Sequence, residues 1–216
     1  MTEERAHPDA ADGSVRRPAA DGVVRRPAAD GAVRRPAADE PDEHVDQGAR
    51  ADGSDLTVRR ASAADARGIA RVHVKAWREA YAGVFSPYLL ENLDVTTRTS
   101  RWERIIASGT DVWVAESGGR IVGWASASEA READGPAPLE LRGIYVLREH
   151  YGTGAGQRVL DASLGDSAAY LWVLADNPRA QAFYRRNGFV LDGTAKVETF
   201  GGEPAHEVRM VRPARR

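Results

Sequence analysis

The sequence predicts an α/β domain in which helices flank a mixed sheet of roughly six to seven strands. An apolar strand pattern over residues 139–146 leads into the glycine-rich turn 152–156, and a helical pattern begins there. A second apolar run, residues 168–175, follows that helix. A strand, helix, strand succession of this kind makes a right-handed crossover, so the two strands are expected to be parallel neighbours.

Length and composition allow one sizeable core, since the chain has 216 residues of which 42% are hydrophobic. Residues 1–54 differ from the rest. They hold three copies of the unit Ala-Asp-Gly-x-Val-Arg-Arg-Pro-Ala, beginning at Ala11, Ala20 and Ala29, and they lack aromatic residues. Proline at every ninth position excludes a continuous helix or a buried sheet. We therefore expect a disordered tail over 1–54 and one folded domain over 55–216.

Composition also excludes several functional classes. The chain has no cysteine, and its five histidines show no ligand spacing, so we expect no metal site. The beginning lacks the pattern of a signal peptide, and the longest apolar run is too short to span a bilayer, so we expect a cytoplasmic protein that does not engage membranes. The tail has 8 arginines against 12 acidic residues, a net charge of −4, which argues against nucleic-acid binding.

The folded part begins with a short strand over residues 56–60, and Ser62 with Asp65 then forms a capping-box pattern. The helix that follows has one apolar stripe. His73 lies on that stripe and is better read as a core or pocket-wall residue than as a catalyst. Ser86-Pro87 opens a second short helix, and residues 97–107 form a third.

Strands dominate the remainder. Residues 111–116 and 120–127 flank a Ser-Gly-Gly turn typical of a hairpin. The run 168–175 reads as a strand buried on both faces. A helix then begins at Asn177-Pro178 and ends near Gly188, which is placed as its C′ residue. Residues 189–190, 194–200 and 207–211 complete the predicted strands.

The glycine turn is suited to hold phosphate, because backbone N–H groups converge there with the positive end of a helix dipole. A Walker loop requires Gly-Lys followed by Ser or Thr, and Gly156-Gln157-Arg158 lacks that lysine. A dinucleotide fingerprint requires Gly-x-Gly-x-x-Gly, and Gln157 and Val159 occupy the positions of the third glycine in the two possible registers. Both nucleotide readings therefore lose a key residue.

Two separated motifs resemble the GNAT superfamily of acetyl-coenzyme A dependent N-acetyltransferases. The turn from Tyr151 to Gly156 matches its pyrophosphate loop, (Gln/Arg)-x-x-Gly-x-(Gly/Ala), except that Tyr151 takes the Gln/Arg position. Residues 177–189, Asn-Pro-Arg-Ala-Gln-Ala-Phe-Tyr-Arg-Arg-Asn-Gly-Phe, resemble its Asn-x-x-Ala-x-x-(Phe/Leu)-Tyr-x-x-x-Gly-Phe motif. The opening segment, Arg59 to Tyr81, is also similar to that of many bacterial members. The resemblance covers about residues 56–212.

This resemblance implies that acetyl-CoA is the co-substrate and that the fourth and fifth strands separate to admit its pantetheine arm. Gly143 would lie at the bulge that this separation requires. Asn177 would contact the arm between the strands. The strand edge and the pyrophosphate cradle would comprise Tyr145, Val146, Leu147, Tyr151, Gly152, Thr153, Gly154, Ala155 and Gly156.

The implied chemistry is direct attack of an amine on the thioester, without a covalent enzyme intermediate. Tyr184 would be the general acid toward the departing thiolate, and it would also contact the cofactor. The base on the fifth strand found in some members is replaced by Trp172, so Glu140 on the fourth strand is the candidate base. Its other reading is a structural ion pair with a nearby arginine such as Arg142 or Arg120.

The acceptor stays open among small-molecule amines and protein amines. Four aromatic residues could line its pocket or belong to the core: Trp77, Tyr81, Trp102 and Trp124. A homodimer is possible. The alternative to an enzyme is a GNAT-like module that binds acyl-CoA without turnover, and a third reading is a DNA-associated protein acting through its tail.

Overall fold

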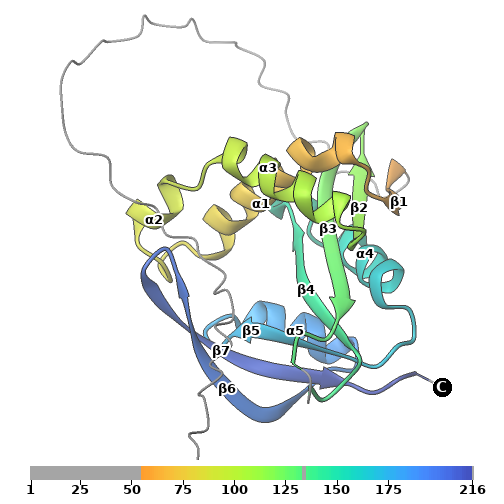
Figure 1. Cartoon of the computed structure of the whole chain (residues 1–216), viewed down its shortest axis with the longest axis vertical. Helices are drawn as coiled ribbons and strands as arrows, with labels where there is room; N and C mark the ends of the chain where they lie inside the picture. Colours follow the sequence, from red (N-terminus) through yellow and green to blue (C-terminus); the bar gives the residue numbers. More distant parts are fainter. Residues whose placement is uncertain (1–54, 133–134, 216) are drawn as a thin grey trace, which may run out of the picture. The chain divides into compact units, whose positions relative to one another are not determined.

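The computed structural model describes residues 55–132 and 135–215, so the predicted tail over 1–54 lies outside the described residues. A seven-stranded sheet runs through them in the order β1-β2-β3-β4-β5-β7-β6 (Figure 1). Among the strand pairs of this described sheet, only β4 and β5 run in parallel, as the crossover predicts. The strands are β1 (Thr57–Arg60), β2 (Asp111–Ser117), β3 (Arg120–Glu129), β4 (Leu139–Val146), β5 (Ala169–Leu174), β6 (Val190–Phe200) and β7 (Glu203–Arg212). The predicted α/β class with a mixed sheet is confirmed.

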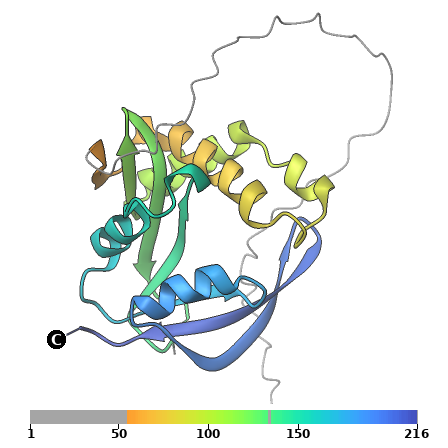
Figure 2. The ribbon, with the colours of Figure 1, turned by 180° about the vertical axis from the view of Figure 1, so that it is seen from behind.

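Helices cover both faces of this sheet. The apolar sides of α1 and α3 pack on β2 and β3, whereas α4 and α5 pack on the opposite face, which is turned toward the viewer in Figure 2. Within the described ranges, no helix is long and apolar enough to cross a membrane. The helices are α1 (Ala66–Ala80), α2 (Pro87–Glu91), α3 (Val95–Ala107), α4 (Ala155–Leu164) and α5 (Pro178–Arg186), with 3₁₀ turns η2 (Ala63–Asp65) and η3 (Arg148–His150).

Local hydrogen bonds explain where the helices begin. The Ser62 backbone N–H donates to Asp65 Oδ2 at 2.7 Å, which is one half of the predicted capping box. Ser86 accepts from Leu89 N at 3.2 Å at the start of α2. Asp94, which the sequence reading did not identify, caps α3 by accepting from Thr97 N at 2.6 Å. Because this cap fixes the N-terminus, α3 begins two residues earlier than predicted.

The core has two sides separated by the sheet. On one side Ile69 and Val72 of α1 pack with Val114 and Trp124. On the other side Leu160 of α4 packs with Leu171, Phe189 and Met210, among others. The strand β5 is buried along nearly its whole length, as the sequence predicts, because it lies between these two layers.

The C-terminal strands differ from the prediction in one respect. Residues 190–200 form a single strand, β6, where the sequence suggested two short ones. The register between β6 and β7 shifts between Leu191 and Ala195, so the intervening residues Asp192-Gly193-Thr194 bulge without ending the strand. Gly193 has φ of 86°, which explains why the segment looked like a break.

Candidate active site

The parallel strands β4 and β5 separate part-way along the sheet. Their pairing covers Leu139 to Leu141 on β4 and ends there. The register between β3 and β4 shifts at Arg142, which is therefore a bulge residue that bends β4 away from β5. A Cβ at Gly143 would lie 3.0 Å from Trp124 Cη2, so only glycine fits beside this bulge without a shift. The predicted opening between the two strands is present, and the predicted bulge lies next to Gly143.

The turn between β4 and α4 exposes a row of backbone donors. Gly152 and Gly154 have φ of 81° and 87°, which glycine adopts without strain, and Gly154 is the N-cap of α4. The Thr153 hydroxyl braces the turn by donating to the His150 carbonyl at 2.8 Å. Within the described ranges, the N–H groups of residues 152, 153, 154, 156 and 157 have no hydrogen-bond partner in the protein. Free N–H groups at the N-terminus of a ten-residue helix fit an anion.

An arginine from α5 lies against Tyr151, the residue that takes the Gln/Arg position of the family pattern. The guanidinium carbon of Arg179 lies 3.3 Å from the centroid of the Tyr151 ring. Arg179 is exposed and belongs to the first turn of α5, so the Tyr151 ring holds a guanidinium beside the glycine turn. Arg179 of α5 thus brings to the turn a guanidinium group, which the family pattern can supply from an arginine at position 151.

Asn177 caps the helix α5, and Tyr184 lies on that helix. Asn177 caps α5, since its Oδ1 accepts from Ala180 N at 3.0 Å, and its side-chain NH₂ has no partner among the described residues. Tyr184 is 7% exposed and packs with Phe183 and Phe189. Burial, together with the nearby Tyr145, raises the pKa of Tyr184 far above its usual value. Its hydroxyl is therefore protonated at neutral pH and can act as a hydrogen-bond donor.

Glu140 lies at the other end of β4, where the two strands are still paired, and it is only 2% exposed. Arg131 binds its carboxylate with both Nε, at 2.9 Å, and Nη2. Arg142 Nη1 and the Tyr170 hydroxyl approach Oε2 at 3.1 and 3.2 Å. Burial alone would raise the pKa of Glu140, but these bonds hold it below its usual value. This geometry favours the structural reading of Glu140 over the catalytic one.

Another carboxylate, that of Glu207, lies beside the separated end of β5. Glu207 of β7 pairs in register with Leu174, the last residue of β5. Its side chain is 12% exposed and lies 3.4 Å from Lys196 Nζ. Burial raises the pKa of Glu207 despite this ion pair. Because β-strand side chains alternate, Glu207 is on the same face as Trp172, the position at which the sequence resemblance would have placed a base.

A pair of hydrogen-bonded phenols lies near the end of β4. Tyr81 from the end of α1 and Tyr145 from β4 have their hydroxyl oxygens 2.9 Å apart. Burial is the main cause of the raised pKa of each phenol, and the charge of Glu207 contributes to both shifts, so this carboxylate lies near them. Tyr81, Tyr145 and Glu207 therefore surround one side of the opening, on the face covered by α1.

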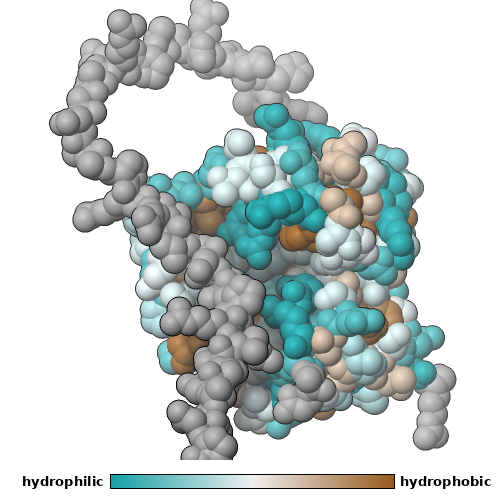
Figure 3. Space-filling view, in the orientation of Figure 1, coloured by the Kyte–Doolittle hydropathy of each residue, from teal (hydrophilic) through white to brown (hydrophobic). Residues whose placement is uncertain are grey.

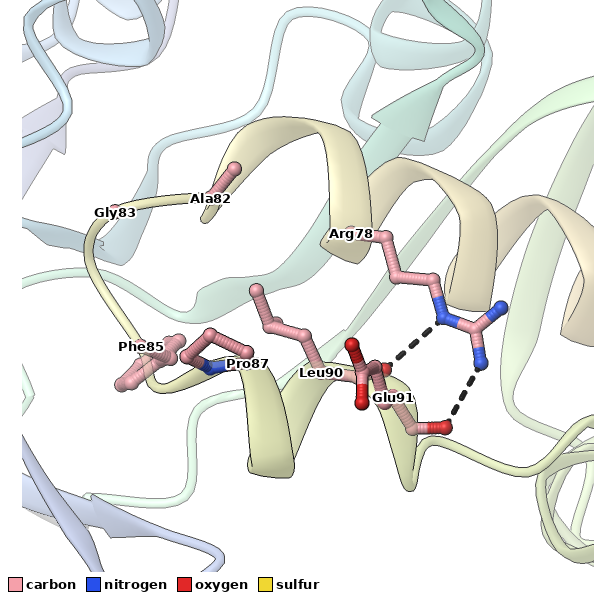
Figure 4. A pocket seen from close by; sticks show the side chains of 7 residues that line it. All are labelled: Arg78, Ala82, Gly83, Phe85, Pro87, Leu90 and Glu91. Carbon is pink, nitrogen blue, oxygen red and sulfur yellow. Dashed lines mark hydrogen bonds between the residues drawn. The ribbon is translucent and has the colours of Figure 1, made fainter.

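Two cavities lie on the periphery of this region. One of about 290 Å³ is formed where α1 meets α2, and Figure 4 shows Arg78 at its edge, donating to the carbonyls of Leu90 and Glu91. The other, of about 400 Å³, includes Glu207 and Lys196 in its wall. On the face shown in Figure 3 the surface is hollowed between the helices above and the C-terminal strands below. Three of the aromatic candidates for the pocket are buried in the core: Trp77, Trp102 and Trp124.

Comparison with known proteins gives the family. A model of the acetyltransferase (GNAT) domain matches residues 108–191, which contain the glycine turn and Tyr184. The N-acetyltransferase YuaI of Bacillus subtilis, itself uncharacterized, is 31% identical over 129 residues, which cover 57% of this chain and 74% of that protein. The chain belongs to the GNAT superfamily. A second relative of this GNAT protein, the probable N-acetyltransferase Rv2775 of Mycobacterium tuberculosis, is 26% identical over 73% of the chain and 90% of its own length.

Solved GNAT structures agree with this assignment. A phosphinothricin acetyltransferase from Sinorhizobium meliloti, in complex with AcCoA, is 26% identical with a TM-score of 0.54. The alignment covers 74% of this chain and 89% of that one. The GNAT family is thus supported by motif, by fold and by sequence relatives, and the chain is an acyltransferase of that family.

Proposed function

We propose that residues 55–216 form a catalytic domain that transfers the acetyl group of acetyl-CoA to a primary amine by direct attack in a ternary complex. One observation carries this proposal: β4 and β5 separate immediately beside a turn whose backbone N–H groups have no partner in the described protein. Such a turn accepts a pyrophosphate, and such a gap accepts a pantetheine arm. Relatives with acetyltransferase names support the reaction type.

The chain's own groups fit acetyl-CoA, which supplies the activated acetyl thioester. The free N–H groups of the glycine turn would bind the pyrophosphate, and Arg179, held on Tyr151, would add a positive charge. The unpaired edge of β4 at Tyr145, Val146 and Leu147 would pair with the amide groups of pantetheine, as an added strand does. The free side-chain NH₂ of Asn177 would complete this contact from α5.

Tyr184 would assist departure of the sulfur. The amine nitrogen forms a bond to the thioester carbonyl carbon and the carbon–sulfur bond breaks, so one proton must leave nitrogen and one must reach sulfur. An ordinary phenol has a pKa near 10 and a thiol a pKa near 8.5, so proton transfer between them would be only mildly unfavourable. Burial raises the pKa of Tyr184, which makes full transfer to the thiolate more unfavourable. We therefore assign Tyr184 to a hydrogen bond that stabilises the developing thiolate, which leaves as CoA thiolate and takes its proton from solvent.

Glu207 is a better base than Glu140. The carboxylate of Glu140 is already held by two guanidinium groups, which lower its pKa, whereas burial raises the pKa of Glu207. A lysine-like amine and an ordinary glutamate differ by about 6 pKa units, or roughly 8 kcal/mol, so a raised carboxylate pKa narrows that gap. Glu207 would take the amine proton directly or through one water molecule.

A thiol-release assay with acetyl-CoA and a panel of amines tests this proposal. We expect turnover with at least one amine and equal activity in the full chain and in residues 55–216. When both substrates are varied, double-reciprocal plots of the initial rate should intersect, as a ternary complex requires. Acetyl-CoA binding without turnover on any amine would favour the acyl-CoA-binding module instead. Activity lost on removal of residues 1–54 would contradict the assignment of catalysis to the folded domain alone.

A further inference from the structure

Arg98, a half-buried arginine without an acidic partner among the described residues, lies on the face of the sheet that α1 and α3 cover. Arg98 projects from α3, and its guanidinium carbon is 5.5 Å from the centroid of the Trp77 ring. Within residues 55–132 and 135–215, no carboxylate forms an ion pair or a hydrogen bond with it. Burial lowers the pKa of Arg98, and the charge of the nearby Arg101 lowers it further. Water can solvate the exposed part of this guanidinium, but the buried part has no counterion among the described residues, so an anion that reached Arg98 would gain an unshared charge partner.

Buried hydrogen-bonding groups without partners lie beside Arg98. The His73 ring stacks on Tyr145 at 5.4 Å and is enclosed by Trp77, Trp102 and Trp124. Neither of its nitrogens has a partner among the described residues, and the same holds for the indole N–H groups of Trp77 and Trp124. Burial, with smaller contributions from Arg98 and Arg101, lowers the pKa of His73 to about 3, so its ring is neutral. One ring nitrogen is then an unused donor.

The phosphates of acetyl-CoA are not suitable partners for Arg98. The glycine turn leads into α4, and Ala155 at its start packs with Val146 on the face opposite α1 and α3. Tyr145, the adjacent residue on β4, points to the other face and packs with the cluster that contains Trp102 of α3. Arg98 lies over the ring of Trp77, whose centroid is 6.5 Å from that of Tyr145. Arg98 therefore belongs to the face that holds Tyr81, Tyr145 and Glu207.

We infer that the acceptor is an amine that also bears an oxyanion, a carboxylate or a phosphonate, and that Arg98 binds this oxyanion. The inference rests on the proposed acetyl transfer and adds the substrate class. Glu207 would receive the amine end of the acceptor, while Arg98 would fix the anionic end over Trp77. A positive group opposite a carboxylate would also orient the acceptor, since an amine bound in reverse would place like charges together.

Matched acceptor pairs test this inference with the full chain. Amino acids with α- and ω-amines are compared with their carboxamides, and 2-aminoethylphosphonate with ethanolamine, by kcat/KM in the thiol-release assay. We expect the anionic member of a productive pair to exceed its neutral partner by about 10- to 100-fold, the range for hydrogen bonds to a charged group. Amidation lowers the pKa of an α-amine and so raises the fraction of neutral, nucleophilic amine at a given pH. This effect would favour the carboxamide, so it cannot produce a preference for the free acid.

Two variants and a control assign the preference to Arg98. Arg98→Gln should raise KM for the anionic acceptors until the preference disappears, and Arg98→Lys should retain part of it. Arg101→Gln, on the same helix but exposed, should keep the full preference. Melting curves of all three variants show whether each is folded, and Arg98→Lys keeps the test informative if the glutamine variant unfolds. Carboxamides used as well as free acids by the wild type would overturn the inference.

A binding measurement separates failure of this inference from failure of the proposed function. The same acids and carboxamides are titrated while tryptophan fluorescence is recorded, because Trp77 lies under Arg98. A saturable change with the acids, lost in Arg98→Gln, would support the anion site even if no amine were acetylated. Turnover of amines without any dependence on the anion or on Arg98 would reject the anion site and leave the acetyltransferase assignment intact.

Discussion

Replacing Glu140 by glutamine separates a structural role from a catalytic one. The carboxylate is 2% exposed and is bound by Arg131, Arg142 and Tyr170. Breaking a buried ion pair costs about 3–5 kcal/mol. The side chain of Arg131 is 58% exposed and that of Arg142 is 33% exposed, so water can solvate both arginines once the carboxylate is gone. We therefore expect Glu140→Gln to lower the free energy of unfolding by about 2 kcal/mol. For a domain of this size, that corresponds to a Tm lower by about 4–8 °C.

The stability difference between wild type and Glu140→Gln should depend on pH in one direction. The folded-state pKa of Glu140 is below its usual value of 4.5, so its contribution to stability is present above pH 4.5. It is lost as pH falls through the folded-state value. The difference in Tm between wild type and Glu140→Gln, measured by calorimetry, should therefore be constant from about pH 7 to pH 5.5 and shrink in more acidic buffers.

Activity of the same variant completes the test, with Glu207→Gln as the matched comparison. Glu140→Gln should keep kcat near the wild-type value at a temperature where it is folded. Glu207→Gln should lose about 10²- to 10⁴-fold in kcat, the usual contribution of a general base, with little change in Tm. A large fall in kcat for Glu140→Gln together with an unchanged Tm would show that Glu140, and not Glu207, is the base.

Two further predictions concern the cofactor side of the opening. Gly154→Ala places a Cβ at a residue with φ of 87°, which should add about 1 kcal/mol of backbone strain. We expect calorimetric titration to give a raised dissociation constant for CoA. Unchanged binding would show that the turn does not hold the pyrophosphate. Tyr184→Phe should reduce kcat about 10²-fold while the dissociation constant for CoA stays the same, and wild-type kcat would remove Tyr184 from the mechanism.

The fold was largely predictable because its signals are local. The apolar run 139–146, the glycine turn and the Asn177 motif each specify their own element, and the crossover rule then places β4 beside β5. The error at residues 189–200 has a similar local cause. Gly193 indicates a break in a single sequence, but pairing with β7 continues on both sides of the bulge and holds β6 together.

The candidate site was predictable only where a motif marks it. Arg179 lies inside the Asn177 motif, yet its contact with Tyr151 joins residues from two different elements, and nothing in the spacing indicates it. Glu207 looks like an ordinary polar residue of an alternating strand. Its importance comes from its register with Leu174 and from burial, which are tertiary properties. Glu140 could be located on its strand, but the approach of Arg131 from the preceding loop was not visible in the sequence.

The proposed acetyl transfer is tested most directly by the initial rate of CoA release from acetyl-CoA, measured with the full-length wild-type chain across a panel of amines. The acetylated product is identified by mass spectrometry. The proposed mechanism predicts one CoA released for each N-acetyl amine formed, and no release beyond spontaneous hydrolysis when the amine is omitted. A protein that binds acetyl-CoA tightly but forms no N-acetyl product with any amine of the panel would contradict it.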